Sequence, residues 1–168
     1  MSACGSNGSG TVARPQTANL NWHENCGTRA DPIPIATHRL VVEKGIWRVT
    51  LSFRNRTRVT LFIMRPHFPG GTWFGLEPFR TSSWREVLER AKAGATVSPR
   101  TLADRFSPAL PRRLPPGRGW SGEFSGRAAL PAGVPIRVVL GQFVDIGQTP
   151  SGLFGGFLCV SERVVRLS

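Results

Sequence analysis

The 168-residue chain has no apolar run that approaches the roughly 18 residues needed to cross a bilayer as a helix, so no transmembrane segment is predicted. It contains no CxxC pair, which disfavours zinc ribbons and thioredoxin-like redox sites. The GxSxG and HExxH patterns of known hydrolases are missing as well. The sequence therefore predicts neither an enzyme nor a protein that holds a metal or another cofactor.

Histidine is scarce, and His23, His38 and His67 are too scattered to form a metal-binding signature. Met64 and His67 offer soft ligands for copper, so a copper or redox carrier that uses them together with the cysteines is one alternative. A core-edge methionine and a loop histidine are the favoured interpretation, because a third ligand is missing.

Lysine and acidic residues are also few. Of the 22 basic residues 20 are arginine, Lys44 and Lys92 are the two lysines, and only ten residues are acidic. The resulting net charge of +12 predicts attraction to an anionic envelope polymer, an anionic lipid or a nucleic acid. A GC-rich coding sequence explains part of the arginine excess without any function.

The basic residues are concentrated between positions 44 and 65, where no acidic residue occurs. This segment predicts a β-hairpin, since Trp47, Val49, Leu51 and Phe53 alternate with polar residues and positions 59–63 continue the pattern after a turn. Its outer side would form a cationic patch, and the alternative is an ordinary solvated surface. The candidate polyanion-binding residues are Lys44, Arg48, Arg54, Arg56, Arg58 and Arg65.

The stretch from Trp120 to Val144 is the most strongly β-like part of the chain. A strand from Trp120 precedes a turn at 130–133, where Gly133 supplies a positive φ, and a second strand follows at 136–144. Both faces of that second strand are apolar, as in a strand near the centre of a β-sandwich. The turn connects either a hairpin or two different sheets. Further strands are predicted at 38–43 and 157–167.

Two helices are predicted within this β framework. Ser82 or Ser83 begins a helix that ends at Gly94, and Ser98-Pro99 begins a second that stops before Pro108. They form a short helical insertion at about 82–107.

The first nineteen residues are small and polar, so 1–19 is predicted to be a flexible tether ahead of a single domain at 20–168. Met-Ser-Ala-Cys at its start resembles the end of a bacterial lipobox, in which the cysteine is lipidated, and Gly5 to Ser9 resemble the spacer that follows. Cys4 is therefore a candidate lipidation site, and the alternative is a chance match.

If Cys4 is lipidated, Cys26 and Cys159 remain as a pair, which is the even number expected of an exported domain. We expect a disulfide between them with Cα atoms roughly 4.4–6.8 Å apart. The alternative is a free Cys26 and a buried Cys159. Asn55-Arg56-Thr57 also fits the glycosylation sequon, a triplet that often arises by chance.

The chain carries a PG-x-x-W…LPxG pattern at Pro116, Gly117, Trp120, Leu130, Pro131 and Gly133. With the strand order over 36–167 it resembles bacterial immunoglobulin-like β-sandwich domains of envelope proteins, including small lipoproteins. The resemblance implies a mainly β, immunoglobulin-like sandwich that is extracytoplasmic, either secreted or membrane-anchored. The first hypothesis is thus a non-catalytic envelope domain that binds an anionic polymer, a lipid or another envelope protein. The second is a cytosolic nucleic-acid-binding protein.

Overall fold

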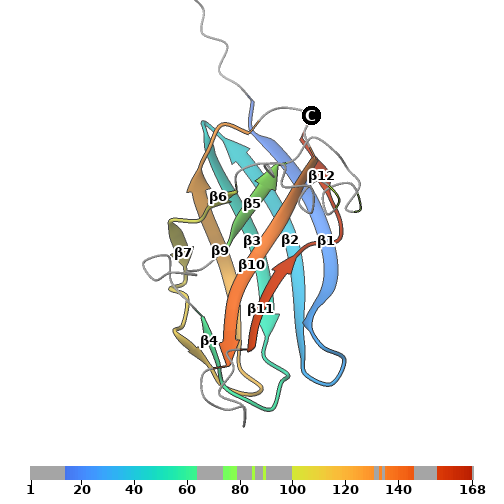
Figure 1. The fold of residues 1–168 in the computed structure, drawn as a ribbon. Coiled ribbons are helices and arrows are strands. Elements are labelled where there is room, and N and C mark those ends of the chain that lie inside the picture. Colours follow the sequence, from blue (N-terminus) through green and yellow to red (C-terminus); the bar gives the residue numbers. More distant parts are fainter. Residues whose placement is uncertain are drawn as a thin grey trace, which may run out of the picture.

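The computed structural model of the chain describes residues 14–63, 74–78, 85, 89, 100–130, 133, 135–145 and 155–167. Regular structure in these residues is almost entirely β-strand (Figure 1). Along the described ranges the strands are β1 Gln16–Gly27, β2 Pro32–Glu43, β3 Ile46–Arg54, β4 Leu61–Ile63, β5 Gly75–Pro78, β6 Thr101–Leu102, β7 Arg105–Ser107, β8 Arg113–Leu114, β9 Gly119–Arg127, β10 Pro135–Asp145, β11 Gly155–Val160 and β12 Val165–Arg166.

The first sheet has five antiparallel strands in the order β1-β2-β3-β9-β7. Its central strand, β3, shows why the sequence forms it. Trp47, Val49, Leu51 and Phe53 are buried, whereas the residues between them are only half-buried. Because successive side chains of a strand point to opposite faces, this sheet has one side toward the core and one outer side.

The second sheet has seven strands and is centred on β10, which pairs along both of its edges. Val139 pairs with Gly75 of β5 and with Val160 of β11, so these two strands lie on opposite edges of β10. β4 lies on the same edge of β10 as β5, and β12 on the same edge as β11. β6 pairs with β5, and β8 pairs with β4. Val138 and Val139, on opposite faces of β10, are both buried, which confirms the predicted central position.

The two sheets lie face to face (Figure 1), and their facing sides share one apolar core. The ring centroids of Phe53 on β3 and Phe143 on β10 are 5.2 Å apart, and those of Phe74 and Phe124 on β9 are 5.7 Å apart. Both pairs meet edge to face, the arrangement that the aromatic quadrupole favours. Aromatic packing therefore joins the two layers.

The two long sides of this arrangement are closed differently. On one side the chain passes from β6 in the second sheet to β7 in the first through Ala103 and Asp104. Their N–H groups donate to the carbonyl oxygens of Phe74 at 2.8 Å and Ser125 at 2.9 Å. Gly126 allows this close passage, because a Cβ atom there would lie 2.6 Å from the carbonyl oxygen of Leu102. On the other side a disulfide joins β1 to β11.

The predicted hairpin at 46–63 is wrong. β3 pairs with β2 and β9, whereas β4 pairs with β10 and β8 in the other sheet. Alternation of apolar and polar residues identifies the core-facing side of a strand, but it does not identify the partner strand. The connection at 130–133 also joins different sheets, since β9 is in the first and β10 in the second. Gly133 has the predicted positive φ, at 73°.

The helix predicted over 98–107 is wrong, because β6 and β7 occupy 101–102 and 105–107. The apolar residues there fit helical spacing, yet Ala103 is buried while its neighbour Leu102 is 38% exposed, as in extended chain. The helix predicted over 82–94 lies outside the described residues except for Arg85 and Glu89, whose backbone is helical.

β1 is a strand that the sequence did not predict. It begins at Gln16, so 16–19 belong to the first sheet rather than to the tether, while 1–13 lie outside the described residues. Leu20, Trp22 and Cys26 are buried on alternate positions, and Asn21 has a φ of 49° beside a register shift. β2 begins six residues before the predicted strand at 38–43, and the predicted final strand is divided into β11 and β12.

Candidate anion-binding surface

Three segments meet at the lower end of the molecule in Figure 1: the turn 28–31, the segment 55–60 after β3, and the loop 115–118 before β9. Backbone hydrogen bonds connect them. Arg56 N donates to Pro32 O at 3.1 Å, Asn55 N donates to Arg118 O at 2.8 Å, and Gly117 N donates to Asn55 O at 2.7 Å. Segments far apart in the sequence therefore form one continuous surface.

This surface is strongly cationic, and we call it the arginine end. With the residues that flank them, the three segments cover 28–31, 54–63 and 110–122, and Asp31 is the only acidic residue in these ranges. The same ranges hold seven exposed arginines: Arg29, Arg54, Arg56, Arg58, Arg112, Arg113 and Arg118. The arginine end therefore has many positive charges from three segments and a single carboxylate, that of Asp31.

Asn55 holds the arginine end together from inside. It is fully buried, and its Nδ2 donates to Val59 O at 2.8 Å and to Leu114 O at 2.7 Å. Its Oδ1 accepts from Thr57 N at 2.9 Å and from the Thr57 hydroxyl at 2.7 Å. The side-chain amide thus uses its full hydrogen-bonding capacity. Its nitrogen is not accessible to a glycan, so the sequon triplet here is a structural turn.

Six of these seven arginines form no ion pair within the part of the chain that the structure describes. Arg58 Nε lies 3.5 Å from Asp31 Oδ1, and the guanidinium carbon of Arg113 lies 5.4 Å from the centroid of the Phe62 ring. Arg54, Arg56 and Arg118 form no ion pair with any residue that the structure describes. Their charges are therefore available to an anion from outside.

Arg54, Arg56 and Arg118 line one groove of about 590 Å³ on the outer side of the first sheet. Its floor is made of small side chains, Ala36 on β2, Ser52 on β3 and Ser121 on β9. The register places these three residues side by side, because Ala36 pairs with Ser52 and Ser52 with Ser121. His23 and Glu24 of β1 line the groove at its other end.

The structure divides the predicted polyanion-binding cluster. Arg54, Arg56 and Arg58 lie together at the arginine end, but Lys44 is in the turn at the opposite end of β3. Ten residues of extended chain separate Lys44 from Arg54, about 30 Å at the usual rise of a strand. Arg48 lies between Glu43 and Glu123, at 3.9 Å from an oxygen of each. Arg65 lies outside the described residues.

Sequence reasoning missed four residues of the arginine end: Arg29, Arg112, Arg113 and Arg118. No local pattern identifies them, since they lie in polar or proline-rich loops distant in sequence from Arg54. Only the pairing of β3 with β9, and the hydrogen bonds of Asn55, bring them together.

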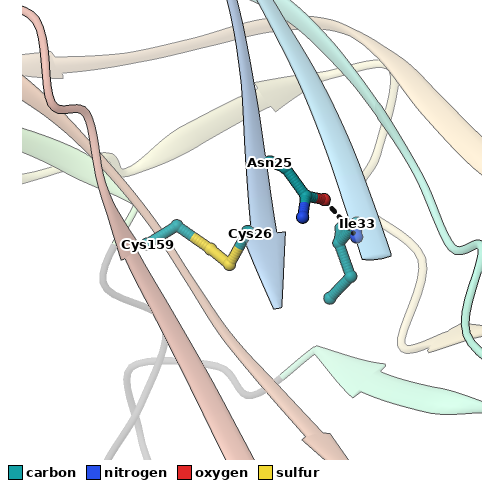
Figure 2. The surroundings of a disulfide bond; sticks show 4 residues. All are labelled: Asn25, Cys26, Ile33 and Cys159. Carbon is teal, nitrogen blue, oxygen red and sulfur yellow. Dashed lines mark hydrogen bonds between the residues drawn. A yellow bond between two sulfur atoms is a disulfide. The ribbon is translucent and has the colours of Figure 1, made fainter. Parts of the chain in front are cut away.

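The predicted disulfide is present (Figure 2). Cys26 of β1 and Cys159 of β11 are bonded, with Cα atoms 5.6 Å apart, within the expected range. Beside Cys26, Asn25 Oδ1 accepts from Ile33 N at 3.0 Å.

Glu24 forms a second link between β1 and the C-terminal segment, because its Oε1 accepts from Glu162 N at 3.0 Å and Arg163 N at 3.3 Å. A second groove of about 510 Å³ runs along this side. Cys4 lies outside the described residues.

No group of three or more histidine, cysteine, aspartate or glutamate side chains that could hold a metal ion occurs in the part of the chain that the structure describes. His23 and His38 are exposed on β1 and β2, and Met64 and His67 lie outside the described residues. Cys26 and Cys159 are bonded to each other, so neither is a free thiolate.

A buried ionic cluster lies away from the arginine end. Glu77 of β5 pairs in register with Arg137 of β10, and Arg100 Nε lies 3.4 Å from Glu77 Oε1. Burial lowers the pKa of Arg137, while the carboxylates of Glu77, Glu24 and Glu162 act in the opposite direction. Because Glu77 and Arg137 are almost completely buried, the cluster is internal and is not open to an external ligand.

The described residues thus define a mainly β protein with two antiparallel sheets and one strongly cationic end. No protein-family model matches the chain, and no curated protein and no solved structure matches it. None of the helical residues that the structure describes belongs to a helix long and apolar enough to cross a bilayer.

Proposed function

We propose that this chain is an exported, non-catalytic β-sandwich domain of the immunoglobulin-like type that binds an anionic polymer of the cell envelope through the arginine end. The observation that carries the proposal is that Arg54, Arg56 and Arg118 line one groove and form no ion pair with any described residue. A guanidinium group binds carboxylate, sulfate or phosphate with two parallel hydrogen bonds, so three of them favour a ligand with several anionic groups.

Export is supported by the disulfide, and tethering by the lipobox-like start of the chain. Disulfides persist in oxidising compartments and are rare in the reducing cytosol, so a bonded Cys26–Cys159 pair favours an extracytoplasmic address. The lipobox-like cysteine, Cys4, adds a means of attachment to the membrane. The immunoglobulin-like assignment extends the resemblance noted in the sequence, in which Gly117 and Gly133 have φ angles of 77° and 73°, as turn glycines do.

A polymer is favoured over a lipid surface by the apolar residues. Peripheral membrane binding is strengthened when exposed apolar area accompanies the positive charge. Among the described residues the only exposed large hydrophobic side chain is Leu102, which lies on β6 and not at the arginine end. Binding to single-stranded nucleic acid needs exposed aromatic rings for stacking, and none of the described Phe or Trp side chains is exposed.

The test compares two charge-reversal variants of equal net charge. Arg54→Glu/Arg56→Glu/Arg118→Glu reverses the groove, and Arg105→Glu/Arg127→Glu/Arg166→Glu reverses three exposed arginines elsewhere. Affinities for fluorescent heparin, duplex DNA and phosphatidylglycerol vesicles are measured over a series of salt concentrations. We expect the groove variant to lose about tenfold or more in heparin affinity, with a shallower salt dependence. The control variant should lose clearly less.

Equal losses in both variants would show that net charge alone attracts the polymer. Tighter binding of DNA or vesicles than of heparin, lost in the groove variant, would move the function to nucleic acid or membrane binding. Export is tested separately by fusing the chain, with its natural upstream sequence, to alkaline phosphatase. Inactivity of that fusion in intact cells would contradict the extracytoplasmic address.

A further inference from the structure

We infer that the groove between Arg54, Arg56 and Arg118 binds an extended chain in which anionic groups are joined by a neutral, hydroxyl-bearing backbone, such as an acidic glycan. The inference rests on the proposed function and deepens it by naming the chemistry of the ligand.

The shape of the groove favours an extended ligand. It crosses four neighbouring strands, and its lining includes the row His23, Ala36, Ser52 and Ser121, one residue from each strand. Three inter-strand steps of about 4.8 Å make this row about 14 Å long. A single phosphate or sulfate would occupy only a small part of that length, whereas two or three linked sugar rings would fill it.

Near Arg54 and Arg118 the lining combines positive charge with hydroxyl groups, whereas Glu24 lines the opposite end of the groove. Arg54 lies one row closer to the arginine end, where it pairs in register with Gly119, and Arg118 precedes that glycine. Beside them, Ser52 and Ser121 bring hydroxyl groups to the floor. Arginine forks suit carboxylates and sulfates, and serine hydroxyls suit sugar hydroxyls, which both donate and accept.

The small floor residues are what make the surface hollow. Ala36 has only a methyl group and the serines only one heavy atom more, so a ligand can approach the sheet closely. In the next row Arg39, Thr50 and Glu123 are larger. Glu123 there lies 3.9 Å from Arg48, and its carboxylate would repel an anion. The groove is therefore bounded on this side by larger side chains, and on β9 by a carboxylate.

The test fills the floor without changing charge. Ser52→Leu places a larger side chain in the groove, and Ser121→Leu does so from the exposed position on the next strand. Ser125→Leu is the matched control, because Ser125 is on the same outer side but pairs with Arg48, outside the groove. The probes are a heparin octasaccharide and an inorganic polyphosphate with the same number of charges.

We expect both groove substitutions to weaken binding of the heparin fragment by about tenfold, while Ser125→Leu changes it by less than about twofold. Melting temperatures should be similar in all three variants. We expect the wild-type protein to bind polyphosphate more weakly than the heparin fragment, since polyphosphate has no hydroxyl groups for Ser52 and Ser121.

Wild-type affinity in both folded groove variants would overturn the placement of the ligand. Equal affinity for the two probes would overturn the hydroxyl-bearing backbone. Both results differ from a failure of the proposed function, in which the wild-type protein binds neither probe or the triple arginine variant keeps its affinity.

Discussion

The side-chain amide of Asn55 donates a hydrogen bond of 2.7 Å to the carbonyl oxygen of Leu114, a residue 59 positions later in the chain. Asn55 follows β3 of the first sheet, and Leu114 is the last residue of β8 in the second. A single buried amide therefore bridges the two layers directly beneath the arginine end. The positions of the exposed arginines depend on a side chain that no ligand reaches.

Replacing this amide should be costly. Asn55→Ala removes the hydrogen bonds to Val59, Leu114 and Thr57, so the Leu114 carbonyl oxygen and the Thr57 N–H each lose this buried partner. We expect the free energy of unfolding to fall by about 2–4 kcal/mol in urea titrations. Asn25→Ala is the control, because it removes one acceptor for Ile33 N near the surface and should cost about 1 kcal/mol. Similar costs for the two variants would contradict the central role of Asn55.

The disulfide should contribute much of the stability. Cys26 and Cys159 are 133 residues apart, and closing so long a loop is worth about 5 kcal/mol in the chain-entropy model. We expect Cys26→Ser/Cys159→Ser to unfold at a much lower urea concentration than the oxidised protein. Cys4→Ser should behave like the wild-type protein both with and without reductant. An unfolding midpoint that reductant does not change would show that the bridge contributes nothing.

The passage from β6 to β7 should be intolerant of even a methyl group. In Gly126→Ala the new Cβ would lie 2.6 Å from the carbonyl oxygen of Leu102 and 2.6 Å from Trp47 Cζ2, so the chain must move. We expect a loss of about 2–4 kcal/mol in thermal or urea unfolding. Ser125→Ala, next to it on the outer side of β9, should change stability by less than about 0.5 kcal/mol. A stable Gly126→Ala protein would mean that this edge is loosely packed.

Glu24 should stabilise the same side of the molecule as the disulfide. Its Oε1 accepts two backbone N–H groups from Glu162 and Arg163, so Glu24→Ala should cost about 1–2 kcal/mol. Hydrogen exchange at those two amides should speed up in the variant. Glu43→Ala serves as the comparison, since Glu43 forms an exposed ion pair at 3.9 Å with Arg48, which contributes little to stability. Unaltered exchange at both amides would refute the anchoring role of Glu24.

The strands that were predicted from the sequence are those that can be identified from the hydrophobic pattern of their own residues. Buried residues alternate along β3, and β10 is apolar on both faces, so both were identified from spacing alone. The pairing of Cys26 with Cys159 was predicted by setting Cys4 aside as a candidate lipidation site, which leaves two of the three cysteines. β1 was missed although Leu20, Trp22 and Cys26 alternate, because the residues between them have the composition of a loop.

The candidate site could not be predicted in the same way, because it depends on which strands are neighbours. After Asn55 the chain leaves the first sheet instead of forming a hairpin with β3. Hydrogen bonds of Asn55 to distant carbonyl groups, such as that of Leu114, stabilise this path. The segment at 98–107 shows the same limit. Leu102, Ala103 and Phe106 fit a helical stripe, yet the open edges of β5 and β9 take up this segment as two short strands.

The direction of β1 gives the molecule a polarity. Gln16, where the strand begins, pairs with Val42 at the end of the sheet remote from the arginine end, and β1 then runs to that end at Gly27 (Figure 1). Twelve residues of strand span about 40 Å. A lipid on Cys4 would hold the protein by its far end and point the arginines away from the membrane. Attached in this way, the domain would leave the arginine end accessible to polymer beyond the lipid headgroups.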